Sequence, residues 1–393
     1  MHQQALRPQS QRPALTQFKM NIRVAMTWNP SKLWVIVVLC AGLLSPQIGR
    51  TQGASQLWGY AAWWLPEGWA TVPLEHLHRL VFFQIEVEAD GRLDKRHGWP
   101  QAWSSLITQA QAKAVPLDLG LSLLDLATFN QLFGSEAATQ TLLQQATELL
   151  EHPAVNGLHI DVEVHVNEGA TPAAIARFRR WLTELAQRMQ QGARQQQLSV
   201  FLPAGDYALI YDAPTMAVVN RVVLQGYDVH YKGGPNAGPL SPLRGNYYTN
   251  WEKLVAMSDS LQVPRHKVIM SFPLYGYEWE VPDCTRFGAH RGESRYTALR
   301  PVDPEKLPDF KVDVQTRVAA HGSRMDLDSG SMSYVVKQEQ GGCTVGWYEG
   351  EDSLVLKSAW ARLQGLLGLA FFALGYDQGL TVRRLMPPGA RQP

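Results

Sequence analysis

The chain has 393 residues, of which 45% are hydrophobic and 18% charged, so it can bury a large core in one domain with insertions or in two domains. Its net charge of +1 gives no electrostatic reason to expect nucleic acid or an acidic membrane surface as a partner. The 13 tryptophans and 13 tyrosines would suit stacking against sugars, although packing in the core is the simpler interpretation for most of them.

Residues 1–55 differ in composition from the rest of the chain. Residues 1–32 carry several Arg and Lys and no acid, and residues 33–44 form an apolar run of 12. This pattern predicts a secretory signal that starts at Met1, Met20 or Met26. The apolar run is too short for a membrane span, which needs about 20 residues. We therefore expect a secreted or periplasmic protein with no stable membrane association.

Removal of this segment would leave Cys284 and Cys343 as the only cysteines. In an oxidising compartment we expect these two residues to form a disulfide, which would stabilise the fold by about 3 to 4 kcal/mol in the chain-entropy estimate. The alternative, two free buried thiols, holds if the chain is not exported.

Apolar runs that alternate with helical patterns predict a (β/α)8 TIM barrel. Continuous rather than alternating apolarity favours parallel strands covered by helices. The strands are predicted at residues 57–64, 78–87, 116–124, 155–165, 197–203, 221–225, 267–274 and 368–374. The helices are predicted at residues 142–150, 171–189 and 251–261, and from an N-cap at Asp352 to Leu363.

Residues 280–346 interrupt this alternation. They are rich in Pro, Gly, Asp and Arg and contain both of the remaining cysteines, which predicts a small inserted module of short strands and turns. The module would lie between the seventh strand and the last helix. The barrel domain would then comprise residues 56–279 and 347–385.

The fourth predicted strand carries a row of polar side chains. Apolar residues at positions 158, 160, 162 and 164 alternate with His159, Asp161, Glu163 and His165. Because side chains alternate along a strand, the two carboxylates point to the same face. A barrel of this type places its chemistry at the carboxyl ends of its strands, where Glu163 lies.

Residues 156–163, N-G-L-H-I-D-V-E, resemble the D-G-x-D-x-D-x-E motif of the family 18 glycoside hydrolases, which are chitinases and related enzymes. The last Asp and the Glu are kept, whereas Asn156 and His159 replace the first two acids. The resemblance extends over roughly residues 57–378. Its further motifs are Q-G-Y-D at 225–228 for M-x-Y-D, S-F-P-L-Y-G-Y-E-W at 271–279 for G-x-P-x-Y-G-x-x-W, an acidic-Ser-x-x-x-Lys stretch within 348–357, and F-A-L at 372–374 where the family has W-x-L.

The resemblance implies a glycosidase that hydrolyses β-1,4-linked N-acetylglucosamine polysaccharide, of the chitin or peptidoglycan type, by a substrate-assisted retaining mechanism. Glu163 would be the general acid, Asp161 would orient the 2-acetamido group, and Tyr227 would donate a hydrogen bond to that group's oxygen. The alternative for the two acids is a solvated or ion-paired strand face. A buried pair of acids without partners is costly, which favours the catalytic interpretation.

Other residues are expected to contact the substrate. They are His159, Asp228, Trp63, Tyr275, Trp279 and Phe372. His159 stands where the family has an acid that shares a proton with the next Asp, and its imidazole could bond Asp161 and, when protonated, hold it as a carboxylate. If this substitution abolishes catalysis, the chain is an inactive, chitinase-like glycan-binding protein.

No Cys/His or carboxylate cluster has metal-ligand spacing, and no dinucleotide or phosphate-binding loop is present. We therefore expect no metal and no cofactor. The expected partner is a polysaccharide or oligosaccharide substrate, and the expected state is a monomer.

Overall fold

The computed structural model describes residues 55–385. The expected signal segment, residues 1–55, lies outside the described residues except for its last position. Within the described part of the chain, no helix is both long enough and apolar enough to cross a membrane.

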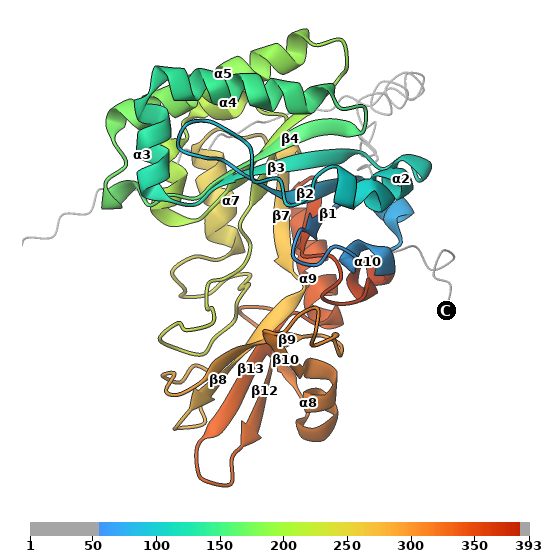
Figure 1. Ribbon diagram of the computed structural model, residues 1–393. Coiled ribbons are helices and arrows are strands. Elements are labelled where there is room, and N and C mark those ends of the chain that lie inside the picture. Colours follow the sequence, from blue (N-terminus) through green and yellow to red (C-terminus); the bar gives the residue numbers. More distant parts are fainter. Residues whose placement is uncertain (1–54, 386–393) are drawn as a thin grey trace, which may run out of the picture. The chain divides into compact units, whose positions relative to one another are not determined.

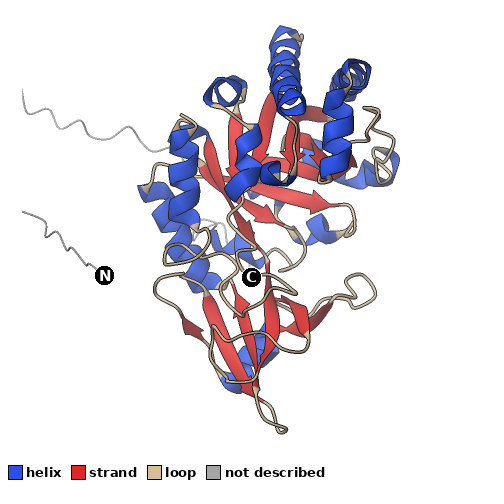
Figure 2. Cartoon of the chain, turned by 90° about the vertical axis from the view of Figure 1, so that its left-hand side faces the viewer, coloured by secondary structure: helices blue, strands red, loops and turns tan. Residues whose placement is uncertain are grey.

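Eight parallel strands close into a barrel in the order β1-β14-β7-β6-β5-β4-β3-β2 (Figure 1). Figure 2 shows helices on the outside of these strands. The predicted (β/α)8 barrel is confirmed, and each predicted strand is present. The strands are β1 (Gln56–Ala62), β2 (Arg79–Glu86), β3 (Leu117–Leu123), β4 (Val155–Val162), β5 (Gln197–Leu202), β6 (Arg221–Leu224), β7 (Val268–Pro273) and β14 (Gly368–Phe372).

Helices cover the barrel, and several of them begin at a residue whose side chain caps the first turn. The longest, α5, starts after Thr171, whose hydroxyl accepts a hydrogen bond from the Ala174 N–H at 3.2 Å. The prediction that Asp352 caps the last barrel helix is wrong, because Gly350 is the N-cap and Asp352 lies in the first turn. The helices are α2 (Ser104–Ala112), α3 (Leu126–Gly134), α4 (Glu136–Glu151), α5 (Pro172–Gln191), α6 (Ala213–Val218), α7 (Trp251–Ser260), α9 (Glu351–Leu363) and α10 (Leu380–Leu385).

A second, six-stranded sheet is inserted between β7 and α9, with the order β10-β9-β8-β13-β12-β11. In the sequence this sheet extends from Tyr275 to Tyr348, a few residues beyond each end of the module expected at 280–346. Helix α8 (Val314–His321) packs against this sheet (Figure 1). The strands are β8 (Tyr275–Val281), β9 (Ser294–Ala298), β10 (Phe310–Asp313), β11 (Arg324–Met325), β12 (Met332–Lys337) and β13 (Cys343–Tyr348).

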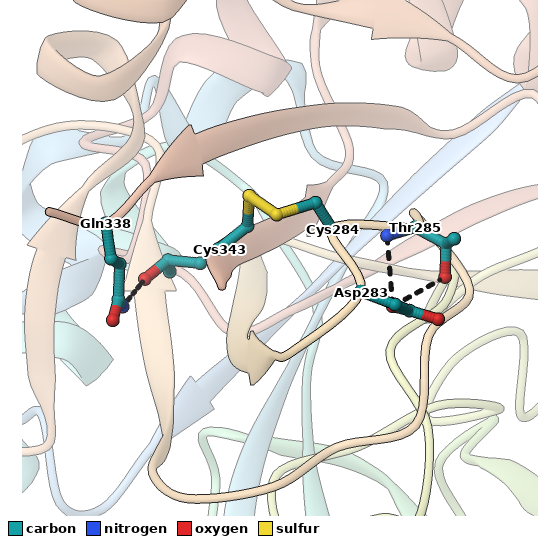
Figure 3. Close-up of a disulfide and its surroundings, with 6 residues drawn as sticks. Asp283, Cys284, Thr285, Gln338 and Cys343 are labelled. Carbon is teal, nitrogen blue, oxygen red and sulfur yellow. Dashed lines mark hydrogen bonds between the residues drawn. A yellow bond between two sulfur atoms is a disulfide. The ribbon is translucent and has the colours of Figure 1, made fainter. Parts of the chain in front are cut away.

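The structure contains the disulfide expected between Cys284 and Cys343, which joins residues 59 positions apart (Figure 3). Cys343 begins β13, and Cys284 lies in the turn that follows β8. The neighbouring Asp283 side chain accepts hydrogen bonds from the backbone N–H of Thr285 at 3.1 Å and from its hydroxyl at 3.0 Å. The disulfide therefore fixes the end of β8 against β13, and the two hydrogen bonds stabilise the turn that carries Cys284.

A buried ion pair connects α9 to the second sheet. The Lys357 ammonium donates to the Glu349 carboxylate at 2.5 Å and to the Ser331 hydroxyl at 3.2 Å, and it also donates to the Ser241 carbonyl. Both charged side chains are fully buried. Lys357 is the lysine of the acidic-Ser-x-x-x-Lys motif, so that motif contributes to packing between parts of the fold.

Candidate active site

The polar face of β4 lies inside the barrel, and the strand register determines its neighbours. Ser199 of β5 pairs with His159, whereas Ser122 of β3 pairs with Asp161. Side chains at paired positions of parallel strands point the same way, so each of these polar residues acquires a hydroxyl group beside it.

His159 is fully buried and is bonded to residues other than Asp161. Its Nε2 is 3.0 Å from the Tyr60 hydroxyl and its Nδ1 is 2.8 Å from the Ser199 hydroxyl. Burial lowers the pKa of His159 to about 3, so the imidazole is neutral at any ordinary pH. The expectation that a protonated His159 holds Asp161 as a carboxylate is therefore wrong, and the buried ring is not open to substrate.

Asp161 and Glu163 are placed at the carboxyl end of β4. Asp161 is 2% exposed and accepts a hydrogen bond from the Ser122 hydroxyl at 3.0 Å, and its Oδ1 has no hydrogen-bond partner within residues 55–385. Burial raises the pKa of Asp161 to about 6. Burial, and then the negative charge of Asp161, raises the pKa of Glu163 well above its usual range. The two groups can thus share one proton near neutral pH.

Tyr227 and Asp228 lie just beyond the end of β6, and Asp228 contacts β8. Asp228 adopts a left-handed backbone conformation, with φ of 59°. Its carboxylate accepts hydrogen bonds from the Tyr275 hydroxyl at 2.7 Å and the Tyr277 hydroxyl at 2.8 Å. Burial raises the pKa of Asp228, and these two bonds oppose the rise.

The glycine before Tyr227 is required by a close approach of two strands. A Cβ atom on Gly226 would lie 2.1 Å from the backbone oxygen of Ser271 in β7. The same glycine donates its N–H to the Ser271 hydroxyl at 2.9 Å. The absence of a side chain therefore lets the Q-G-Y-D segment pack against β7 and sets the position of Tyr227.

Aromatic rings form a continuous row across the mouth of the barrel. The Phe372 ring stacks on Tyr227 with ring centroids 5.6 Å apart and contacts Tyr60 at 5.5 Å and Phe83 at 5.4 Å. Trp64 continues the row at 6.2 Å from Phe372. Phe372 therefore occupies a central place in the row, although it replaces the tryptophan of the W-x-L motif.

Two of the aromatic residues expected to contact substrate differ in exposure. Trp63 is 38% exposed, so one part of its ring is open to solvent. Trp279 is fully buried, and its indole N–H donates to the Tyr231 carbonyl at 3.2 Å. The expectation that Trp279 lines a sugar subsite is therefore wrong, because none of its ring is accessible. Tyr275 is 4% exposed, and its hydroxyl donates to Asp228.

Several residues around the site were not identified from the sequence. A signal for two of them was present, because Ser122 and Ser199 are the only hydroxyl residues of two mainly apolar, buried strands. No comparable signal marked Tyr60 or Phe83, whose strands read as ordinary apolar runs. Within the described part of the chain, no group of three or more His, Cys, Asp or Glu side chains is placed to hold a metal ion.

Comparisons with known proteins agree with the barrel fold. The sequence profile of the Glycosyl hydrolases family 18 matches residues 121–377. A Bacillus subtilis protein named as a sporulation-specific glycosylase, YdhD, is 28% identical over 159 residues, which are 39% of this chain and 34% of that protein. The B. subtilis protein named "Uncharacterized glycosylase YvbX" is 23% identical over 259 residues, 64% of this chain and 66% of that protein. Both alignments thus cover less than two thirds of the relative's own length.

The fold is also shared with solved structures. The spore cortex-lytic enzyme SleL of Bacillus megaterium matches with a TM-score of 0.64 at 18% identity, covering 85% of this chain and 74% of that chain. At this level of identity the match concerns the fold of the two chains.

Proposed function

Because the chain belongs to the Glycosyl hydrolases family 18, we propose that it hydrolyses a β-1,4-linked N-acetylglucosamine polysaccharide of the chitin or peptidoglycan type. The observation that carries this proposal is the pair formed by Asp161 and Glu163. Both acids have raised pKa values, and no neighbouring cation lowers either value. Such a pair can hold one carboxylate and one carboxylic acid side by side, as acid catalysis requires.

The proposed reaction uses the substrate's own acetamido group as the nucleophile. Glu163 donates its proton to the glycosidic oxygen, while the acetamido oxygen attacks the anomeric carbon and the carbon–oxygen bond to the leaving sugar breaks. The Asp161 carboxylate orients the acetamido group and stabilises the resulting cation. Glu163, now ionised, accepts a proton from a water molecule that attacks the same carbon, so the product retains the β-configuration.

The aromatic and tyrosine groups around these acids support this mechanism. The Phe372 ring forms an apolar surface beside Tyr227, which suits the flat face of a sugar ring. In the proposed complex the Tyr227 hydroxyl donates to the acetamido oxygen. Asp228, held by two tyrosine hydroxyls, also contributes to the raised pKa of Glu163.

A second candidate is a glycan-binding protein without catalysis, and the replaced motif acids favour it. The Asn156 side chain is accounted for by the fold, because its Oδ1 accepts a hydrogen bond from the Leu117 N–H at 2.9 Å, at the amino end of β3. His159, however, has no acidic function to replace the missing carboxylate. Turnover therefore has to be measured directly.

The names of the relatives bear on the kind of substrate, and the disulfide bears on where the protein acts. Glycosylase and cortex-lytic enzymes act on polysaccharide, which supports a polymeric substrate here. The Cys284–Cys343 disulfide is compatible with an oxidising compartment, so we propose that the chain acts after secretion or in the periplasm. We also propose that it acts as a monomer.

The full chain is tested with chitooligosaccharides, peptidoglycan and cello-oligosaccharides, and the products are read by mass spectrometry. We expect cleavage of an N-acetylated substrate, none of cello-oligosaccharides, and a first product in the β-configuration by proton NMR. Glu163→Gln should reduce kcat by about 10²- to 10⁴-fold. Glu184→Gln, an equivalent change on the exposed side of α5, should not affect it. Binding of the oligosaccharide without any turnover would favour the second candidate.

A further inference from the structure

We propose that His97 and Glu86 position Trp63 as a sugar-stacking platform, which binds a sugar unit beyond the one that lies over Asp161 and Glu163. This inference rests on the proposed function, because it assigns a remote subsite to the same cleft. Trp63 would contact the substrate, and His97 and Glu86 would act through Trp63.

The Trp63 ring is supported by an imidazole and is partly exposed. Its ring stacks on the His97 imidazole with centroids 4.0 Å apart and an angle of 10° between the planes. The tryptophan nevertheless remains 38% exposed, whereas core tryptophans such as Trp58 and Trp251 are fully buried. A flat ring that stacks on a neighbour and keeps this much exposure offers a surface on which the apolar face of a pyranose packs.

The position of Trp63 relates it to the catalytic residues. Trp63 contacts Trp64 edge-on at 5.8 Å, Trp64 lies 6.2 Å from Phe372, and Phe372 stacks on Tyr227 at 5.6 Å. Trp63 is thus the outer end of the aromatic row that begins beside Tyr227. An extended sugar chain that follows this row from the acids would reach the exposed ring of Trp63.

The imidazole is itself held by other groups. Its Nε2 is 3.0 Å from the Glu86 carboxylate, and the Glu86 Oε2 also pairs with Lys95 at 3.3 Å. The Trp103 indole N–H donates to the His97 carbonyl at 3.0 Å, which anchors the backbone of the same residue. His97 has a φ of 47°, a conformation that a residue other than glycine rarely adopts without such constraints. These contacts hold the His97 imidazole in place within the loop between β2 and α2.

The ligand suited to this surface is a neutral pyranose unit of the same polymer. Stacking requires a flat apolar face and no charge, and the groups that support the tryptophan are already paired with each other. The platform would therefore improve the binding of long substrates and leave short ones unaffected, because a short substrate bound at the acids does not reach it.

The test compares hydrolysis of a hexamer and a dimer of N-acetylglucosamine, each with a chromogenic leaving group, by the full chain. Trp63→Ala and His97→Ala should each raise KM for the hexamer about tenfold, with kcat unchanged. Neither variant should change KM for the dimer. His97→Phe should restore the hexamer KM only in part, because it keeps a flat ring behind the tryptophan but loses the contact with Glu86. The double alanine variant should be no weaker than Trp63→Ala alone.

Controls separate this inference from general damage and from the proposed function. His266→Ala, at an exposed position before β7, should leave both substrates unaffected. Equal effects on the hexamer and the dimer, or an unaffected hexamer KM in His97→Ala, would overturn the platform. If the parent chain hydrolyses neither substrate, the proposed function fails. The platform is then tested by calorimetric titration, which measures the affinity for the hexamer. Weaker binding by Trp63→Ala and His97→Ala would support the platform, and unchanged binding would reject it.

Discussion

Replacement of Ser122 by alanine should move the acid limb of the pH–rate profile to higher pH. The Ser122 hydroxyl donates to Asp161 Oδ2 at 3.0 Å, and the other oxygen of that carboxylate has no hydrogen-bond partner in the described part of the chain. Asp161 is 2% exposed, so water cannot readily replace the lost hydroxyl. The change therefore removes a bond that stabilises the charged form of Asp161.

The size of the effect follows from the strength of that bond. A hydrogen bond to a charged group contributes about 1.5 to 3 kcal/mol, and a change of one pH unit in pKa corresponds to about 1.4 kcal/mol. Loss of the bond should thus raise the pKa of Asp161, now about 6, by roughly one to two pH units. Since the mechanism needs Asp161 ionised, turnover falls as the pH drops through this pKa, and the fall would begin at higher pH in the variant.

The assay is the pH dependence of kcat on a chitooligosaccharide, with thermal unfolding measured on the same samples. Ser258→Ala is the matched control, because Ser258 is also fully buried but its hydroxyl makes no hydrogen bond to any described residue. An acid limb in Ser122→Ala that coincides with the parent's, in a folded protein, would refute the assignment of Asp161. A shift shared by Ser258→Ala would indicate a general packing effect instead.

Three further outcomes are expected. Lys357→Ala should lower the unfolding free energy by about 3 to 5 kcal/mol in denaturant melts, because it leaves Glu349 buried without its cation, while Lys357→Met combined with Glu349→Leu should recover most of the loss. Replacement of both disulfide cysteines by serine should cost about 4 kcal/mol for a loop of 59 residues, and an unchanged melt would show that the bond does not restrain the unfolded chain. Tyr277→Phe should raise the pKa of Asp228 by removing one of its two donors, so activity should fall mainly at acid pH, and a uniform loss at every pH would contradict this role.

The barrel itself was predictable because each strand is an apolar run of suitable length between helical patterns. The motif strand illustrates this. Alternation along residues 155–165 was sufficient to predict that Asp161 and Glu163 share a face, and the effect of the Asp161 charge on the pKa of Glu163 agrees with that prediction. The disulfide was also predictable, because the composition of residues 1–55 left only two cysteines for pairing.

The details of the site were not predictable, because alternation assigns a face but does not identify the neighbours on it. His159 was expected to bond Asp161, two residues along the same strand, yet its partners come from β1 and β5. Trp279 belongs to a motif shared with the family, and only the packing of the second sheet shows that its ring is buried. The support of Trp63 by His97 depends on how the loop after β2 folds back, which no local pattern encodes.

A single residue, Leu274, separates the last residue of β7 from the first residue of β8. The inserted sheet therefore cannot be exchanged as an independent unit, because its first strand brings Tyr275 and Tyr277 to Asp228. A chimera that exchanged residues 275–348 for a short linker could still close its eight-stranded barrel, but the Asp228 carboxylate would lose both donors. Recombination between relatives should accordingly keep β8 with the barrel and place its crossover points after Val281.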